Sequence, residues 1–251
     1  MQARAAIVTG AGRGIGRAIA LALARDGRSV AVADLLGDGA RAVAAEIEQD
    51  GGNALAVELD VTDAASVKGA VERAEGSLGP LEILVNNAGW DELRPFLDTD
   101  ERFWERVLDV NFKGALRMTH ALLPGMVERG FGRIVSIGSD AGRVGSSLES
   151  VYSGAKGGVI AFTKTIAREA ARDGVTANTV CPGPTDTPML AEIVAAHGDA
   201  ERVIGAMTRA VPMRRLARPE EIAAAVAFFA SEQAGFITGQ TLSVSGGLTM
   251  A

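Results

Sequence analysis

Residues 5–16 read Ala-Ala-Ile-Val-Thr-Gly-Ala-Gly-Arg-Gly-Ile-Gly. The first five form a short apolar run, which predicts a strand over Ala5–Thr9. Glycine then recurs at positions 10, 12, 14 and 16, and an amphipathic pattern predicts a helix from about Arg17 to Asp26. A strand that passes through a glycine-rich turn into a helix is the local context that a dinucleotide phosphate site requires.

The glycine turn is therefore a candidate binding site for a pyrophosphate. Because its glycines have no side chains, the turn lets the phosphates approach the backbone N–H groups and the N-terminus of the following helix. The spacing is G-x-x-x-G-x-G through Gly10, Gly14 and Gly16, and it differs from the commoner G-x-G-x-x-G because position 15 is Ile15. We expect Gly10, Arg13, Gly14, Ile15 and Gly16 to contact the cofactor.

Asp34 directly follows the second predicted strand, Arg28–Ala33. It lies 18 residues beyond Gly16, where an acid hydrogen-bonds the ribose hydroxyls of NAD and repels the 2′-phosphate of NADP. The alternative is a turn-forming or capping aspartate. Arg13 argues for NADP, since an arginine in this loop is able to meet a 2′-phosphate. Given the glycine turn, we predict NAD.

The rest of the chain alternates between strand and helix patterns. Further strands are predicted over 54–59, 81–85, 133–137, 175–180 and 241–244, and the longest helix over 100–127. The alternation predicts one doubly wound parallel sheet of about seven strands with helices on both faces, and one domain over 1–251. The pattern loosens over 188–218, where scattered methionines predict a segment that covers the substrate. An ordinary helical pair over the sheet is the alternative.

Composition narrows the class of protein. Of the 251 residues, 47% are hydrophobic and 22% charged, as in a soluble globular domain. The net charge of −6 argues against a nucleic-acid or polybasic membrane surface. One cysteine, Cys181, and two histidines predict neither an internal disulfide nor a metal site. No apolar run is long enough to span a membrane and no signal-peptide pattern opens the sequence, so we expect a cytoplasmic protein.

Small and polar residues follow the other strands, at the edge where open α/β sheets bind ligands. The cofactor contacts expected there are Asp60, Val61, Asn87, Ala88, Gly89, Pro182, Gly183, Thr185 and Thr187. A helix cap is the alternative for Asp60. The substrate contacts expected there are Trp90, Ser139, Arg143, Tyr152, Gly183 and Met189. Trp90 has the alternative role of covering the edge of the core.

Tyr152 and Lys156 are four residues apart at the start of a helix predicted from Tyr152 to about Ala171. Positions i and i+4 share one face of a helix, so a phenol and an ammonium lie side by side. A neighbouring cation favours the phenolate, and the pair is therefore a candidate proton-transfer device. Packing of the two stems against each other is the alternative for the pair taken alone.

In their order along the chain, these residues resemble the short-chain dehydrogenase/reductase family, and the resemblance covers nearly the whole sequence. Its components are Thr9-Gly10 with Gly14 and Gly16, Asp60, Asn86-Asn87-Ala88-Gly89, Asn111, Ser139, Tyr152 with Lys156, and Pro182-Gly183 with Thr187. The resemblance implies a Rossmann sheet, a nicotinamide cofactor bound in part by Tyr152 and Lys156, and a homotetramer.

The resemblance also implies a catalytic tetrad of Asn111, Ser139, Tyr152 and Lys156. In it, Tyr152 exchanges a proton with the substrate oxygen, and Ser139 positions that oxygen and stabilises its developing charge. Lys156 lowers the pKa of Tyr152 and holds the nicotinamide ribose, while Asn111 supports a water molecule in a proton relay.

Four segments are similar to those of 2-hydroxycyclohexanecarboxyl-CoA dehydrogenases, namely 86–91 (NNAGWD), 139–147 (SDAGRVGSS), 180–187 (VCPGPTDT) and 235–250 (GFITGQTLSVSGGLTM). This similarity implies oxidation of a ring alcohol on a CoA thioester. Alternatives are a 3-oxoacyl-carrier-protein reductase, a dehydrogenase of free aromatic or alicyclic alcohols, and a nucleotide-binding regulatory protein without catalysis.

Overall fold

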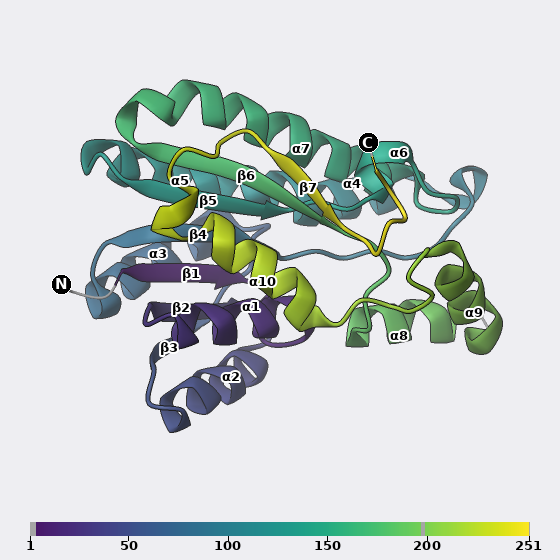
Figure 1. The fold of residues 1–251 in the computed structure, drawn as a ribbon, viewed down its shortest axis with the longest axis horizontal. Helices are drawn as coiled ribbons and strands as arrows, with labels where there is room; N and C mark the ends of the chain where they lie inside the picture. The colour runs from purple at the N-terminus through teal and green to yellow at the C-terminus, as the bar shows by residue number, and fades with distance from the viewer. Residues whose placement is uncertain (1–3, 197–198, 251) are drawn as a thin grey trace.

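One parallel sheet organises the computed structural model, which describes residues 4–196 and 199–250 (Figure 1). Its strands are β1 (Ala5–Thr9), β2 (Ser29–Asp34), β3 (Asn53–Glu58), β4 (Leu81–Asn86), β5 (Gly132–Ile137), β6 (Val175–Pro182) and β7 (Thr241–Val244). They lie in the order β3-β2-β1-β4-β5-β6-β7, and each neighbouring pair is parallel. The predicted doubly wound sheet is thus confirmed.

Strand β1 is buried on both faces, which explains its continuous apolar sequence. Because side chains alternate along a strand, Ala6 and Val8 enter one core cluster while Ala5 and Ile7 enter the other. Both clusters are built mostly from Ala, Val, Leu and Ile, as the low aromatic content predicts.

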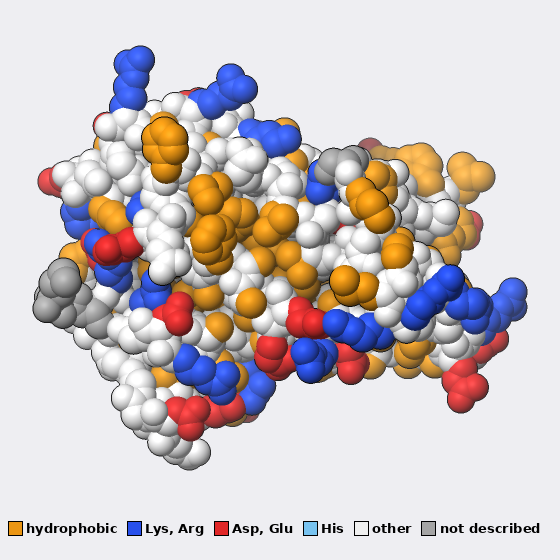
Figure 2. Space-filling view, viewed as in Figure 1, with side chains coloured by type: hydrophobic (Ala, Val, Ile, Leu, Met, Phe, Trp, Pro, Cys, Tyr) orange, Lys and Arg blue, Asp and Glu red, His pale blue; other side chains and the backbone are white. Residues whose placement is uncertain are grey.

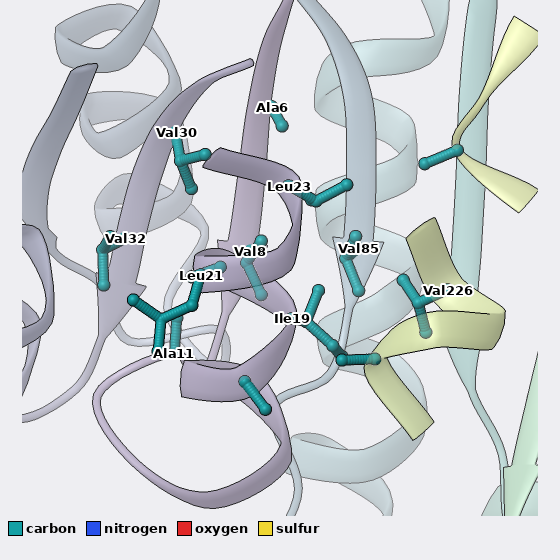
Figure 3. Packing of buried hydrophobic residues seen from close by; sticks show 14 of the residues in the cluster. Ala6, Val8, Ala11, Ile19, Leu21, Leu23, Val30, Val32, Val85 and Val226 are labelled. Atoms are coloured by element: carbon teal, nitrogen blue, oxygen red, sulfur yellow. The ribbon is translucent and has the colours of Figure 1, made fainter. Parts of the chain in front are cut away.

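Helices cover both faces of the sheet (Figure 1). The helices are α1 (Gly14–Arg25), α2 (Gly37–Gln49), α3 (Ala64–Leu78), α4 (Glu101–Leu108), α5 (Gly114–Glu128), α6 (Ala141–Val144), α7 (Ser150–Ala170), α8 (Pro188–Ala196), α9 (Ala200–Ala210) and α10 (Pro219–Phe229). The first core cluster draws on α1, α2 and α10, and the second on α3, α5 and α7. Figure 3 shows Ile19 of α1 with Val85 of β4 and Val226 of α10. Each such fully buried side chain contributes about 1.5–3 kcal/mol.

The helix predicted over 100–127 is continuous from Glu101 to Glu128 but contains a π-helical turn. Helix α4 ends at Leu108, a π-helical turn spans Asp109–Lys113, and α5 begins at Gly114. The side chain of Asn111 donates to the carbonyl of Val107 at 2.9 Å, four residues earlier, and thus competes with the helical backbone pattern. Wider π turns of this kind occur frequently at functional sites.

The carboxyl ends of the strands meet at one edge of the sheet, and α8 and α9 lie beyond that edge (Figure 1). The described residues of the segment predicted to cover the substrate thus form two helices, with the turn from Val211 to Arg218 after them. Within the described residues, no helix is both long and apolar enough to cross a membrane.

Candidate active site

The glycine turn between β1 and α1 adopts a conformation that needs glycine. Gly10 and Gly14 have φ values of +62° and +56°, in the left-handed region. A Cβ on Gly16 would lie 2.1 Å from the carbonyl oxygen of Gly10, so the turn closes onto the helix. Arg13, the residue before α1, makes no side-chain capping hydrogen bond. The first N–H groups of α1 therefore suit an anion such as a pyrophosphate.

Asp34 at the end of β2 is fixed beside this turn. Its Oδ2 accepts from the backbone N–H of Gly12 at 2.8 Å, and its Oδ1 accepts from the N–H of Leu36 at 2.9 Å. Both the ribose-binding position and the turn-forming role considered for this aspartate are therefore compatible with its place in the fold.

Arg13 pairs with Glu192 of α8. Its Nη2 donates to Oε2 of Glu192 at 3.0 Å, and its Nη1 also contacts that carboxylate. Both side chains are about half exposed, at 51% and 59%, so the pair contributes little to stability. It links the glycine turn to the covering segment.

Asn87 cross-links β4 to the glycine turn. Its Nδ2 donates to the carbonyl oxygens of Thr9 and Gly10, at 2.8 and 3.0 Å. The hydroxyl of Thr9 accepts from the N–H groups of Asn87 and Ala88, each at 3.0 Å. Asn87 and Ala88 thus lie at the predicted cofactor site, where the amide side chain of Asn87 shapes the turn.

Asp60 and Val61 line the next part of the same edge. Asp60 accepts from both the N–H and the hydroxyl of Thr62, at 2.8 and 2.7 Å, and so fixes a local turn. The N-cap of α3 is Asp63 and not Asp60. Val61 is buried, and its Cγ2 would lie 2.8 Å from a Cβ on Gly114. The valine therefore packs where α5 begins.

Asn111 is fixed by three hydrogen bonds. Besides the bond to Val107, Nδ2 donates to the carbonyl of Trp90 at 2.7 Å, and Oδ1 accepts from the N–H of Trp90 at 3.3 Å. A Cβ on Gly89 would lie 3.0 Å from Oδ1 of Asn111 and 3.6 Å from Nζ of Lys156, so only glycine leaves room between them. A cavity of about 10 Å³ lined by Asn111 and Lys156, among others, is the size of one water molecule.

Lys156 is buried, with 3% of its surface exposed. Its Nζ donates to the carbonyl of Ile137 at 2.9 Å, two residues before Ser139, and lies 5.6 Å from the ring centroid of Tyr152. Burial lowers the pKa of Lys156 to about 8. The helix spacing therefore places the ammonium beside the phenol, as expected.

The pKa of Tyr152, in contrast, is raised well above its usual value. Burial is the largest cause, followed by the charges of Asp91 and Glu149, while a hydrogen bond with Ser139 acts in the opposite direction. Lys156 thus does not bring this pKa below its usual value in the protein alone, because burial and the charges of Asp91 and Glu149 act in the opposite direction.

The loop after β6 returns to the glycine turn. A Cβ on Gly14 would lie 3.5 Å from Cγ2 of Thr187, and the Thr187 hydroxyl accepts from the N–H of Leu190 at the start of α8. Thr185 is buried and donates to the carbonyl of Gly183 at 2.9 Å. Pro182 ends β6, and Met189 is half-buried on α8. These predicted residues are thus brought to one edge.

The side chains of two residues that were predicted to contact the substrate, Trp90 and Arg143, interact with other residues of the protein. The guanidinium of Arg106 lies 3.7 Å from the ring centroid of Trp90, and Phe103 meets that ring edge to face. Trp90 therefore packs on side chains of α4, and its contact with the substrate stays a prediction. Arg143 donates to the hydroxyl of Ser243 in β7 at 2.6 Å, so its guanidinium is tied to the sheet edge.

Asp91 and Glu149 were missed by the sequence reasoning. Asp91 is 6% exposed, and both residues act on the charge state of Tyr152. A helical spacing of three residues between Glu149 and Tyr152 was the available signal for one of them. No spacing relates Asp91 to Tyr152, because the two meet only through the fold. Among the described residues, no group of three or more His, Cys, Asp or Glu side chains is arranged to hold a metal ion.

Comparison with known proteins identifies the family. A family model described as enoyl-(acyl-carrier-protein) reductase matches residues 10–249. The chain belongs to the short-chain dehydrogenase/reductase family. This dehydrogenase/reductase is 40% identical over 250 residues to a 3-oxoacyl-(acyl-carrier-protein) reductase of Vibrio cholerae, covering 100% of this chain and 99% of the relative. It is 43% identical over 249 residues to nodulation protein G of Azospirillum brasilense, covering 99% of both chains.

Two further comparisons agree. An acetoacetyl-CoA reductase of Shinella zoogloeoides is 39% identical over 245 residues, covering 97% of this dehydrogenase/reductase and 98% of the relative. A variant of actinorhodin polyketide ketoreductase, solved with NADPH, superposes with a TM-score of 0.94 at 36% identity, covering 98% of this chain and 97% of the other. The protein is thus an oxidoreductase that acts on keto or hydroxyl groups, in a family that binds nicotinamide cofactors.

Proposed function

We propose that this dehydrogenase/reductase interconverts a secondary alcohol and a ketone on an acyl thioester, with NAD(H) as cofactor and a cyclic acyl group as its preferred substrate. The observation that carries the proposal is the convergence of Tyr152, Ser139 and Lys156 beside the glycine turn. Ser139 hydrogen-bonds with Tyr152, and Lys156 is anchored to the same strand end through Ile137.

In this proposal each side chain has a separate role. Tyr152 gives a proton to the ketone oxygen, or takes one from the alcohol. Ser139 donates a hydrogen bond to the same oxygen and stabilises negative charge on it. Lys156 supplies a positive charge beside the phenol. Asn111 holds the loop at Trp90 and lines the cavity of about 10 Å³, where a water molecule would connect with Lys156.

The residues around the glycine turn fit a dinucleotide. Gly10, Gly14 and Gly16 leave backbone N–H groups open to a pyrophosphate, and Thr187 faces Gly14. We infer that these residues hold the cofactor, together with Asp34 at the ribose and Lys156 at the nicotinamide ribose. A nicotinamide held by these residues would supply or accept the hydride.

A preference for NAD is supported by Asp34 and by the position of Arg13. The carboxylate of Asp34 lies at the end of β2, where a 2′-phosphate would be repelled. Arg13, the residue able to neutralise such a phosphate, is paired with Glu192 instead. The related ketoreductase was solved with NADPH, so the NAD/NADP ratio is the first quantity to measure.

The thioester substrate is supported by two lines of comparison. Segments 86–91, 139–147, 180–187 and 235–250 are similar to those of 2-hydroxycyclohexanecarboxyl-CoA dehydrogenases. Relatives named for 3-oxoacyl-carrier-protein and acetoacetyl-CoA reduction match the chain over nearly its whole length. Reduction of a 3-oxoacyl-carrier protein with NADPH is the second candidate.

A homotetramer is part of the proposal. Figure 2 shows hydrophobic side chains gathered over α10 and β7. The exposed residues of this region include Phe228, Phe236 and Leu242, and Phe236 is fully exposed. An apolar surface of this kind is typical of an interface between subunits. Light scattering tests it, and a monomer at micromolar concentration would contradict it.

The experiment that tests the function measures turnover in both directions with NAD(H) and NADP(H). The panel contains 2-hydroxy- and 3-hydroxyacyl-CoA thioesters, the matching ketones, the free acids and simple cyclic alcohols. We expect the highest kcat/KM with a cyclic acyl-CoA and NAD(H). Equal kcat/KM on the free alcohols would show that the enzyme does not require a thioester. A strong preference for NADPH with an acyl-carrier protein would favour the second candidate.

A further inference from the structure

Asp140 is a buried acid directly after Ser139, and the mechanism above gives it no role. It is 4% exposed. Its Oδ1 accepts from the hydroxyl of Ser243 in β7, while its Oδ2 receives no hydrogen bond from any described residue. Among the described residues, the Ser243 hydroxyl is therefore the single donor to this carboxyl group. A buried acid with so few partners is costly and calls for a reason.

The bond from Asp140 to β7 is unusual for a residue in its position. Asp140 is the N-cap of α6, where an aspartate ordinarily accepts from the N–H groups of its own helix. Its side chain makes no such capping bond here. Helix α6 spans only Ala141–Val144, which is too short to be stable by itself. The side chain that would ordinarily cap α6 thus joins it to the last strand of the sheet.

Arg143, near the end of α6, binds the same hydroxyl. Its Nη1 donates to Oγ of Ser243 at 2.6 Å, and its backbone N–H donates to the carbonyl of Asp140 at 2.9 Å. A hydroxyl group accepts with its lone pairs and has one proton to donate, so Ser243 serves the guanidinium and the carboxyl group at once. One serine of β7 therefore holds both the beginning and the end of α6.

Helix α6 in turn contacts two parts of the candidate site. The N–H of Ala141 donates to Oγ of Ser139 at 3.1 Å, which occupies a lone pair of that hydroxyl and leaves its proton to be donated. A Cβ on Gly142 would lie 2.7 Å from the carbonyl carbon of Lys156, so α6 is in close contact with the backbone of α7. A shift of α6 would therefore move Ser139 relative to α7, the helix that carries Tyr152.

We propose that Ser243 is a positioning residue, which orients the hydroxyl of Ser139 through Asp140 and Arg143. The proposal rests on the role proposed above for Ser139. That hydroxyl must meet the same substrate oxygen as Tyr152, and a displacement of about 1 Å at an active site costs about 100-fold in rate. The residue that sets its place lies in the last strand, 103 residues beyond Asp140. A merely structural tie would stabilise the whole fold without orienting Ser139.

The first test is hydrogen–deuterium exchange of the folded protein, which needs neither substrate nor cofactor. The amides of residues 141–145 all donate hydrogen bonds within α6 or to Ser139 and Asp140. Ser243→Ala removes the hydroxyl that holds this segment, and we expect these amides to exchange about tenfold faster or more, as the loss of a hydrogen bond to a charged group predicts for local opening. The amides of β5 and β6 should keep their protection.

Thr241→Val is the matched control for this experiment. Thr241 lies two residues from Ser243, on the same face of β7, and its hydroxyl bonds to no described residue. The variant removes a hydroxyl from the same strand and should leave the exchange of residues 141–145 as it is in the wild type. Unchanged exchange of this segment in Ser243→Ala would overturn the proposal. Faster exchange of all segments alike would also overturn it, because the tie would then be merely structural.

The second test compares rates on a substrate of the panel that the wild type turns over. Ser243→Ala should lower kcat about 10–100-fold and change KM less, and Ser243→Thr, which restores a hydroxyl, should recover most of the rate. In a Ser139→Ala background, Ser243→Ala should have little further effect, because the hydroxyl that it positions is already absent. Full multiplication of the two effects would mean that Ser243 does not act through Ser139.

Failure of the proposed function is recognised separately from failure of this inference. If the wild type turns over no member of the panel, or if Ser139→Ala keeps the full rate, the proposed function is wrong. The exchange experiment still gives its result in that case, since it measures only whether Ser243 holds α6 and the hydrogen bond from Ala141 to Ser139.

Discussion

The side-chain amide of Asn111 donates a 2.7 Å hydrogen bond to the carbonyl of Trp90, and this bond joins the π-helical turn to the loop after β4. Asn111 is 2% exposed, so water does not replace the bond when it is lost. The next residue of the loop, Asp91, therefore depends on Asn111 for its place beside Tyr152. The irregular turn and the buried acid belong to one arrangement.

The first prediction follows from that bond. Asn111→Leu removes three hydrogen bonds and leaves both backbone groups of Trp90 without the partner they have in this fold. We expect the free energy of unfolding to fall by about 2–4 kcal/mol, measured by urea denaturation. Thr165→Ala, which removes one exposed 3.3 Å bond within α7, should change it by less than about 0.5 kcal/mol. Similar values for the two variants would contradict the role of Asn111 as a tie between loop and helix.

Tyr152→Phe removes the hydroxyl that is proposed to move the proton and keeps the ring. General acid–base catalysis contributes about 10²–10⁴-fold, so we expect kcat to fall by that factor while the melting temperature changes little. The cofactor affinity, measured by fluorescence of bound NADH, should stay within a few-fold of the wild type. Substantial turnover retained with NAD would exclude Tyr152 as the acid or base.

Asp34→Asn keeps the size of the side chain and removes the charge that is proposed to exclude a 2′-phosphate. We expect the ratio of kcat/KM for NADH to kcat/KM for NADPH to fall about tenfold or more, which corresponds to about 1.4 kcal/mol. Asp50→Asn, at the exposed C-terminal end of α2, is the matched charge change and should leave the ratio as it is. An unchanged NADH/NADPH ratio in Asp34→Asn would show that other residues set the cofactor preference.

The stability of the protein should depend on pH through Asp91. The pKa of Asp91 is raised from 3.8 to about 8 in the folded protein. Its contribution is therefore fully present below about pH 4 and is lost as the pH rises toward 8, because the folded state binds the proton more tightly. Asp91→Asn lacks this loss, so its melting temperature relative to the wild type should rise between pH 5 and pH 8 on thermal scans. A pH-independent difference would mean that Asp91 is not protonated in the fold.

Two helical glycines test the closure of the turn. A Cβ on Gly16 would lie 2.1 Å from the carbonyl oxygen of Gly10, whereas nothing lies within 4 Å of a Cβ on Gly76 in α3. Gly76→Ala should stabilise the protein by about 0.5–1 kcal/mol through helix propensity. Gly16→Ala should destabilise it by a few kcal/mol and weaken NADH binding, because the turn must open. Thermal scans and NADH fluorescence measure both effects, and equal behaviour of the two variants would show that the turn is not closed onto α1.

The alternation of apolar strands with amphipathic helices determined the sheet by itself. Local periodicity is sufficient for this, because strands of a parallel sheet are buried on both faces and their sequences are continuously apolar. The helix over 100–127 is confirmed in extent, but its π-helical turn was not predicted, since periodicity does not report a side chain such as Asn111 that bonds to the backbone of its own helix. The irregular turn became visible only with the tertiary partner, Trp90.

In the candidate site, too, some features were predicted from the sequence and others were decided by the tertiary structure. The glycine turn, Asp34 and the Tyr152–Lys156 pair were predicted from sequence, because short spacings fix their geometry on a strand end or on one helix face. The charge environment of Tyr152 was decided by the tertiary structure. Asp91 is 61 residues away in the chain, and only the packing of the loop after β4 against α7 brings it to the phenol. Because burial and distance set a pKa, the sequence determined which proton-transfer group is present, and the fold determined which charge state it holds.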